Sequence, residues 1–296
     1  MLRGQEQLAL PHDPTLSPRA VRRIGGDSAS ASVEPRSVLH RGADARDPSR
    51  LLGLHRIMLE LEGYAALLFD LDGVVTDTAT LHAAAWKQLF DEFLEQRALE
   101  RGEPFVEFDA DGDYRAHVDG RRRYDGVDTF LRSRGIELPW GDPSDGPDAP
   151  TVCGLGNRKD RYFMAALRER PIAIYEDAVA LIRAARDRGQ RIAVVTSSAH
   201  GEHVLRAAGL WELFDVAVTG VEAAALGLAG KPAPDTFVAA AGQLGVEVPR
   251  AVVFEDAVSG VEAGRAGGFG LVVGVDRRGG GSALAEHGAD IVVSHL

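Results

Sequence analysis

An apolar run that ends in two aspartates is the feature of this sequence that most constrains its fold. Residues 65–69 (Ala-Ala-Leu-Leu-Phe) are followed by Asp70, Asp72 and Gly73. A run of this length that stops at a glycine turn predicts a buried strand. Residues two apart lie on one side of a strand, so both carboxylates are expected together at its carboxyl end. Two like charges that close are costly unless a cation or a shared proton relieves them, and Mg²⁺ is a cation that carboxylates prefer.

Strands and helices alternate along the rest of the chain, which predicts an α/β fold built on a doubly wound parallel sheet. Residues 58–79 and 173–296 are expected to form this α/β core. Residues 80–172, inserted after the first strand, are expected to form a helical domain, called the cap below. Further strands are predicted at 191–196, 216–218, 251–255, 271–275 and 290–293, and helices at 80–100, 126–134, 158–170, 176–188, 201–208, 234–245 and 258–266.

The composition narrows the classes of partner. The 296 residues are 45% hydrophobic, enough for a sizeable hydrophobic core, and carry a formal net charge of −11. This charge argues against a nucleic acid or an anionic membrane surface as partner, while a small anionic substrate stays possible. Cys153 is the only cysteine, which excludes an intrachain disulfide and is consistent with a cytoplasmic protein. The sequence has no run of 18 apolar residues, so no transmembrane helix is predicted.

Residues 1–57 differ in composition from the rest of the chain. They mix Pro, Ser, Arg, Gly and Asp without apolar periodicity, and are expected to be a disordered extension. They contain no secretory signal. A transit peptide is one alternative, and a translation start at Met58 is a simpler one.

Four polar segments are expected to meet at the carboxyl edge of the sheet, where ligands bind in open α/β folds. The first holds Asp70 and Asp72, and the third is a loop that carries Lys231. Carboxylates can hold Mg²⁺, the lysine supplies a fixed positive charge, and hydroxyls with nearby N–H groups can cradle phosphoryl oxygens. Together these groups favour phosphoryl transfer through an aspartyl-phosphate. The other two segments are Thr196-Ser197-Ser198 and Glu255-Asp256.

These segments resemble those of the haloacid dehalogenase-like superfamily of aspartate-nucleophile phosphotransferases, over residues 64–294. Residues 70–87 (DLDGVVTDTATLHAAAWK) are similar to the β-phosphoglucomutase subfamily, as are residues 157–160, 231–235 and 255–256. The resemblance implies that Asp70 is the nucleophile and a metal ligand. It implies that Asp72 is the general acid and base and offers its backbone carbonyl to Mg²⁺. Glu255 and Asp256 would complete the metal site.

The resemblance also assigns positioning and binding roles. Thr78 and His82 would position Asp72, while Thr196 and Lys231 would hold the transferring phosphoryl group. The Lys231–Pro232 bond is expected to be cis, as in the subfamily. The residues expected to contact the sugar phosphate are Trp86, Gly126, Lys159, Ser197, Ser198 and His200. Simpler structural roles remain open for some of these residues: Trp86 as a hydrophobic-core residue, His82 as a surface residue, and Glu255-Asp256 as a helix N-cap pair.

The sequence departs from the subfamily pattern in the cap. The arginine that grips the non-reacting phosphate is expected after a Gly-Val pair, where this chain has Gly126-Val127-Asp128-Thr129. The run 121–123, three arginines, lies just upstream and could substitute. His200 stands where an asparagine is expected, and the cap carries extra residues at 102–122 and 138–154.

Three functions follow from the resemblance. The first is a Mg²⁺-dependent β-phosphoglucomutase that converts β-D-glucose 1-phosphate to glucose 6-phosphate through a bisphosphate. The second is a sugar-phosphate phosphatase, motivated by the missing cap arginine. The third is a non-catalytic module that regulates a phosphorylase. The four polar segments argue against this third function, because each keeps residues suited to catalysis. Relatives with longer caps occur beside or fused to glycoside phosphorylases, so a functional link to such an enzyme is expected.

Overall fold

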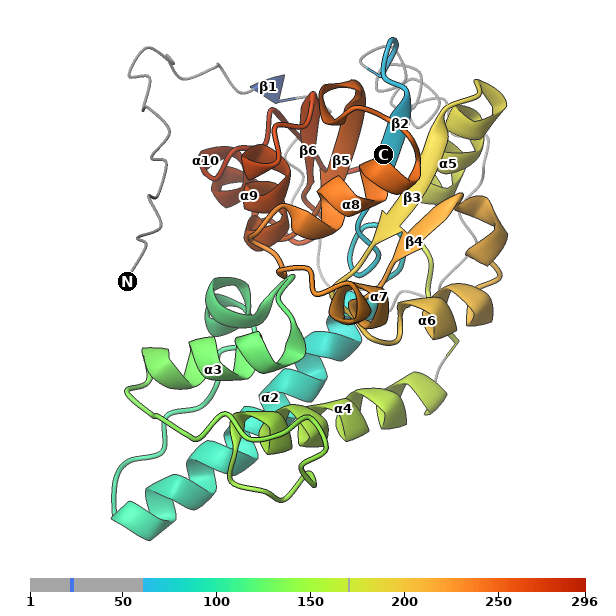
Figure 1. Ribbon diagram of the computed structural model, residues 1–296. Coiled ribbons are helices and arrows are strands. Elements are labelled where there is room, and N and C mark those ends of the chain that lie inside the picture. The colour runs from blue at the N-terminus through green and yellow to red at the C-terminus, as the bar shows by residue number, and fades with distance from the viewer. Residues whose placement is uncertain (1–21, 24–60, 170) are drawn as a thin grey trace, which may run out of the picture.

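A parallel sheet forms the centre of the α/β core. The computed structural model describes residues 22–23, 61–169 and 171–296. The sheet has the order β7-β6-β5-β2-β3-β4, with β1 (Arg22–Arg23) paired to β7 at its outer edge (Figure 1). This arrangement confirms the predicted doubly wound α/β fold. The strands are β2 (Ala66–Phe69), β3 (Arg191–Val195), β4 (Val216–Val218), β5 (Ala251–Glu255), β6 (Leu271–Val275) and β7 (Ile291–Val293).

Helices cover both faces of the sheet, which is why the central strand β2 is apolar along its whole length. Leu67 and Phe69 of β2 face the side covered by α5 (Glu176–Asp187) and α6 (Gly201–Ala207). Ala66 and Leu68 face the opposite side, as the two-residue period of a strand requires. That side is covered by α8 (Asp235–Gln243), α9 (Val258–Ala266) and α10 (Gly281–Glu286).

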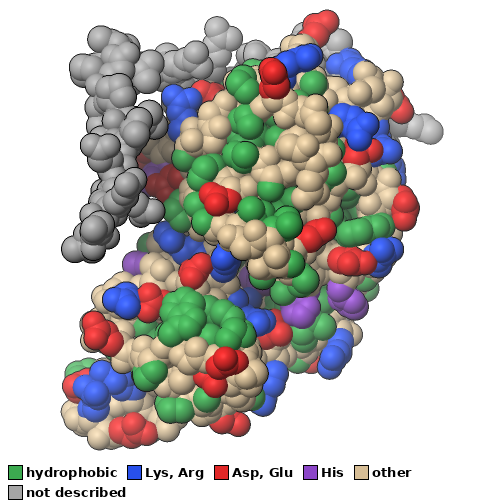
Figure 2. Space-filling model, viewed as in Figure 1, with side chains coloured by type: hydrophobic (Ala, Val, Ile, Leu, Met, Phe, Trp, Pro, Cys, Tyr) green, Lys and Arg blue, Asp and Glu red, His purple; other side chains and the backbone are tan. Residues whose placement is uncertain are grey.

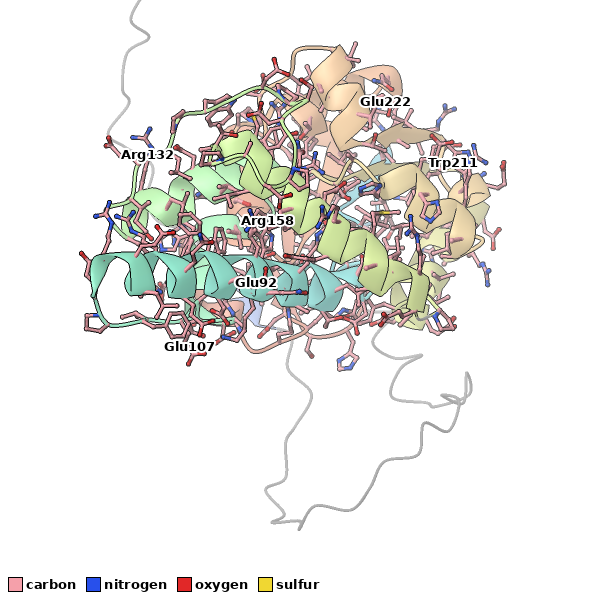
Figure 3. All side chains as sticks on the ribbon, turned by 90° about the horizontal axis from the view of Figure 1, so that it is seen from below. Glu92, Glu107, Arg132, Arg158, Trp211 and Glu222 are labelled. Atoms are coloured by element: carbon pink, nitrogen blue, oxygen red, sulfur yellow. The ribbon has the colours of Figure 1, made fainter. Side chains whose placement is uncertain are left out.

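The cap is a separate helical layer with its own hydrophobic cluster. It contains α2 (Thr78–Arg101), the π-helical turn η1 (Tyr114–Val118), α3 (Arg123–Ser133) and α4 (Val152–Glu169). Figure 3 shows α2 and α4 side by side, and Tyr162 of α4 donates to Glu92 of α2 over 2.5 Å. Trp86 and Phe90 stack at 5.3 Å between ring centroids inside this layer.

Two adjacent chain segments connect the cap to the α/β core. The amide of Asp77 donates to the Ala173 carbonyl over 2.9 Å, and that of Tyr175 donates to the Val75 carbonyl over 2.9 Å. The two segments by which the chain leaves and re-enters the α/β core are therefore hydrogen-bonded to each other. The domain boundaries predicted from the sequence, 79/80 and 172/173, stay a prediction, and α2 begins at Thr78, before the first of them.

Some predicted elements were displaced or missed. The helix predicted at 158–170 begins at Val152, where the Thr151 hydroxyl accepts from the Gly154 amide over 2.9 Å as an N-cap does. Gly154 and Gly156 made this turn look like a loop in the sequence. The short helices α7 (Gly220–Ala225) and α10 were not predicted, because neither is long enough to show apolar periodicity.

Two expectations concern the ends and the membrane. The predicted disorder of residues 1–57 lies outside the described residues, apart from 22–23. None of the helices within the described ranges is long and apolar enough to cross a membrane.

Candidate functional site

A cavity of about 540 Å³ lies between the cap and the carboxyl edge of the sheet. The order of the strands in the sheet reverses direction at β2, which lies between β5 and β3. In open α/β sheets, ligands bind at the carboxyl ends of the strands at such a reversal. Figure 2 shows Lys and Arg side chains gathered where the cap meets the α/β core. Of the predicted site residues, the cavity is lined by Asp70, Asp72, His82, Trp86, Lys159, Thr196, Ser197, Ser198, His200 and Asp256.

Lys231 joins two carboxylates beneath the cavity. Its Nζ lies 2.5 Å from Asp70 Oδ1 and 2.5 Å from Glu255 Oε1, and all three side chains are nearly fully buried. Burial lowers the pKa of Lys231, but the two carboxylates outweigh this effect and raise it, so the side chain is a cation. Burial and the charge of Glu255 raise the pKa of Asp70 well above its usual value despite the lysine. The Lys231–Pro232 bond is cis, as predicted.

Three carboxylates form a group that could hold a metal ion. One oxygen from each of Asp70, Glu255 and Asp256 lies within 4.8 Å of the others. Burial and the charges of Asp119 and Glu255 raise the pKa of Asp256 well above its usual value. Crowded, buried carboxylate oxygens that repel one another fit a hard divalent cation, which would relieve the repulsion.

Gly73 permits the close packing of this group. Its φ is +101°, and a Cβ at this position would lie 1.9 Å from Asp256 Oδ2. Residues with a side chain rarely adopt such a φ. The glycine after the second aspartate therefore has two roles, to turn the chain and to leave room for Asp256.

The carboxylate of Asp72 is separate from this group and has other partners. It accepts hydrogen bonds from the hydroxyls of Thr78 and of Thr196, the latter over 2.9 Å. Burial raises its pKa, but the charge of His82 and the hydrogen bonds outweigh burial and lower the pKa well below its usual value. The carboxylates grouped for a metal ion are therefore those of Asp70, Glu255 and Asp256, and the relief of both Asp70 and Asp72 by one cation stays a prediction.

His82 and Lys159 form a buried pair behind Asp72. Lys159 Nζ lies 2.5 Å from His82 Nδ1, and the imidazole stacks on Phe163 at 4.0 Å between ring centroids. Burial lowers the pKa of Lys159 to about 7, and burial with the nearby lysine lowers the pKa of His82. Nε2 of His82 is buried without a hydrogen-bond partner and lies 3.5 Å from Asp72 Oδ1. This imidazole is therefore placed to act on Asp72.

The cavity lining also contains a network around Asp160 that the sequence analysis did not predict. Asp160 of α4 accepts from His200 Nε2 over 2.9 Å and pairs with the guanidinium of Arg123. Burial raises the pKa of Asp160, but hydrogen bonds and charge from His200 and Arg123 lower it to about 2. Because Asp160 directly follows Lys159 on α4, its position next to a predicted contact was the signal that could have identified it.

The arginine run 121–123 lines the cavity, so the cap does bring positive charge to the site, from upstream of Gly126-Val127. Gly126 itself is not among the lining residues. It packs under the indole of Trp86, where a Cβ would lie 3.3 Å from Cζ2. Thr78, Lys231 and Glu255 also lie behind the cavity surface, in contact with residues that line it. Val221 of α7 lines the wall without any signal in the sequence.

Comparisons with known proteins agree with this geometry. The family model of haloacid dehalogenase-like hydrolases matches residues 64–268. A protein named β-phosphoglucomutase from Mycobacterium bovis is 48% identical over 251 residues, which are 84% of this chain and 94% of that protein. A protein named uncharacterized glycosyl hydrolase from Mycobacterium tuberculosis is 38% identical over 231 residues, 78% of this chain but 17% of that longer protein.

Solved structures share the fold. The crystal structure of β-phosphoglucomutase from Clostridium difficile superposes with a TM-score of 0.62 at 23% identity, over 78% of this chain and 91% of that one. The sheet order, the inserted cap and the match to the family model lead to one assignment. The chain belongs to the haloacid dehalogenase-like hydrolase family.

Proposed function

We propose that this protein is a Mg²⁺-dependent β-phosphoglucomutase that converts β-D-glucose 1-phosphate to glucose 6-phosphate. The observation that carries the proposal is that two aspartates lining one cavity have different partners. Asp70 lies beside the buried ammonium of Lys231, whereas Asp72 is held by two hydroxyls and faces His82. The 48% identity to a β-phosphoglucomutase over most of both chains supports the same function.

The first step that the geometry supports is attack by Asp70 on phosphorus. The bond from its carboxylate oxygen to phosphorus forms as the bond from phosphorus to the sugar oxygen breaks, which leaves an aspartyl-phosphate. Lys231 balances the negative charge on the transferring group. Asp70, Glu255 and Asp256 would hold Mg²⁺, which when bound neutralises further charge on the phosphoryl oxygens.

Asp72 is suited to move the proton. Its lowered pKa keeps it ionised, which is the state needed to accept a proton from the sugar hydroxyl that attacks the aspartyl-phosphate. The proton then returns to the sugar oxygen that leaves when the other phosphate is transferred back to Asp70. Thr78 and Thr196 fix the carboxylate for both transfers.

A second group of basic side chains in the cavity is suited to the second phosphate of the bisphosphate. Arg123, His200 and Lys159 surround Asp160 there, and the rest of the arginine run lines the same cavity. Trp86, Ser197 and Ser198 line the same cavity, and we propose that they contact the sugar. A mutase has to bind both ends of its substrate, and a cavity with two groups of cations meets this need.

One experiment tests the proposal. The protein is given β-D-glucose 1-phosphate, Mg²⁺ and a trace of glucose 1,6-bisphosphate, and glucose 6-phosphate and free phosphate are followed in parallel. A mutase produces glucose 6-phosphate without matching free phosphate. Stoichiometric release of phosphate would instead identify a sugar-phosphate phosphatase, and the absence of any product would favour a non-catalytic regulator of a phosphorylase.

The source of the substrate is the finer part of the proposal. A glycoside phosphorylase in the cytoplasm would supply β-D-glucose 1-phosphate directly. The relative named glycosyl hydrolase supports this link, because a segment similar to this chain forms 17% of its length. Mixing the purified protein with a β-glucose 1-phosphate-forming phosphorylase, its disaccharide, inorganic phosphate, Mg²⁺ and a trace of glucose 1,6-bisphosphate should yield glucose 6-phosphate, and no product from the coupled mixture would contradict the link.

A further inference from the structure

One guanidinium is shared between a carboxylate of the cap and a carboxylate of the α/β core. Arg278 follows β6, and its Nη2 lies 3.4 Å from Asp256 Oδ2 and 3.7 Å from Asp119 Oδ2. Asp256 follows β5, whereas Asp119 directly follows η1 in the cap. The Asp256 and Asp119 side chains are 4% and 9% exposed, whereas that of Arg278 is 34% exposed.

Two further residues of the cap contact Arg278. Its guanidinium lies 5.5 Å from the ring centroid of Tyr114, and Arg115 Nη2 donates to the Arg278 carbonyl over 3.1 Å. Both residues belong to η1. The cap therefore contacts the side chain and the backbone of Arg278, although the two segments are more than 150 positions apart.

The same cap segment is attached to the α/β core by its backbone. The hydroxyls of Ser259 and Ser197 donate to the carbonyls of Asp119 and Gly120, over 2.8 Å and 2.7 Å. Gly120 has a φ of +69°, and a Cβ there would lie 2.3 Å from Ser259 Oγ. The glycine thus allows a close approach of cap and core, and this approach sets the distance from Asp119 to Arg278.

We propose that Arg278 is a positioning residue that couples closure of the cap to metal binding at Asp256. The proposal uses one element of the proposed function, Asp256 as a metal ligand. The guanidinium competes with a metal ion for the Asp256 carboxylate. When the cap closes, Asp119 attracts the same guanidinium and makes Asp256 more available. Closure and metal binding then favour each other, and by linkage the effect is equal in both directions.

This arrangement predicts opposite effects of two substitutions on metal affinity. Arg278→Gln removes the competitor, so Mg²⁺ binds more tightly. Asp119→Asn removes the carboxylate of the cap that attracts the guanidinium. Arg278 then pairs with Asp256 alone, so Mg²⁺ binds more weakly. Both substitutions break the contact between cap and core, so both should increase the opening of the cap.

The experiment measures the Kd of Mg²⁺ by calorimetry and the exchange of amide hydrogens in residues 114–122, on the full-length protein. We expect the Kd to fall about fivefold in Arg278→Gln and to rise about fivefold in Asp119→Asn, a typical size for coupling between sites. Exchange in residues 114–122 should accelerate in both. The control is Arg265→Gln, which removes a more exposed arginine that pairs with Asp290 at 3.4 Å and should change neither quantity.

The outcomes are decisive in each case. A Kd that shifts in the same direction in both variants, or unchanged exchange in both, would overturn the proposal. If Arg278→Gln does not fold, Arg278→Met takes its place, because its unbranched side chain also removes the positive charge beside Asp256. Neither readout requires turnover, so a protein without mutase activity can pass this test and a mutase can fail it.

Discussion

Lys231 Nζ lies 2.5 Å from Oδ1 of Asp70, in a site where the two side chains are 1% and 7% exposed. The proposed nucleophile and the cation proposed to stabilise its product are therefore in contact before any substrate arrives. The lysine also contacts Glu255, so one positive charge serves two buried carboxylates. The contact links catalysis to stability, because removing a buried partner leaves a buried charge uncompensated.

Lys231→Met is expected to damage both activity and stability. Loss of the ammonium should lower kcat by about 100-fold or more, and the free energy of unfolding by about 3–5 kcal/mol. Activity assays and urea unfolding measure the two effects. The matched control is Lys87→Met, which removes a lysine whose ion pairs are solvent-exposed and should change stability by less than about 1 kcal/mol. Equal effects of the two substitutions would contradict the assigned role.

Asp70→Asn is expected to abolish turnover without unfolding the protein. The amide keeps the shape of the side chain and relieves repulsion with Glu255, but it cannot form the acyl-phosphate bond. The expected loss of transition-state stabilisation exceeds about 3 kcal/mol, the cost of removing one electrostatic donor. Mass measurement after incubation with glucose 1,6-bisphosphate should detect phosphorylated protein only in the unaltered chain. Retained turnover in the variant would refute the covalent mechanism.

Asp72→Asn should leave the fold intact and slow both phosphoryl transfers. The amide oxygen can still accept one of the two hydrogen bonds, from Thr78 or from Thr196, but the amide cannot take a proton. A loss of about 100- to 10,000-fold in kcat is expected for a general acid and base. Thr78→Val provides the comparison, because it removes one hydrogen bond and leaves the carboxylate. Single-turnover kinetics in each direction would show whether only one transfer is slowed, which would contradict the shared role.

Lys159 makes the stability of the protein depend on pH. Its pKa is about 7 in the folded protein and near 10.5 in the unfolded chain, so between these values the unfolded state binds more protons. The free energy of unfolding should therefore rise with pH from about 7 to about 10, by up to about 1.4 kcal/mol per pH unit. Lys159→Met should remove this rise, which urea unfolding at a series of pH values measures. The same slope in Lys159→Met as in the unaltered chain would contradict the assignment.

Gly73→Ala should weaken metal binding as well as stability. The new Cβ would collide with the Asp256 carboxylate, and the φ of +101° adds backbone strain. Gly63→Ala separates the two effects, since Gly63 has a φ of +94° and nothing within 4 Å of a Cβ. Both variants should lose about 1–3 kcal/mol of stability through strain. Only Gly73→Ala should raise the Kd of Mg²⁺, and calorimetry on the two proteins checks this.

Much of the fold could be predicted from local patterns. Every strand described between 66 and 293 coincides with a predicted one, because strands buried on both faces are short apolar runs between polar turns. The start of α4 was predicted six residues late, since Gly154 and Gly156 hide a helix that Thr151 caps. A helix N-cap is a contact between residues three positions apart, so it adds nothing to the apolar periodicity from which helices are predicted.

The candidate site was predictable only in part. Asp70, Asp72, Thr196 and Asp256 line the cavity as expected, because each follows a strand and parallel strands end at one edge. Asp160, Asp119 and Arg278 were missed, since each acquires its role from a partner on a distant segment. Gly126 was placed in the site by its motif, yet it packs under Trp86.

The sequence by itself determined that two aspartates stand at the end of a buried strand, with a lysine and two more acids at neighbouring positions of the sheet edge. Only the tertiary structure decided how the charges pair. It placed Lys231 on Asp70 and Glu255, His82 beside Asp72, and Arg278 between the cap and the α/β core. The physical reason is that strand periodicity is a local property of the chain, whereas the partner of a charge depends on side chains that packing brings together from distant segments.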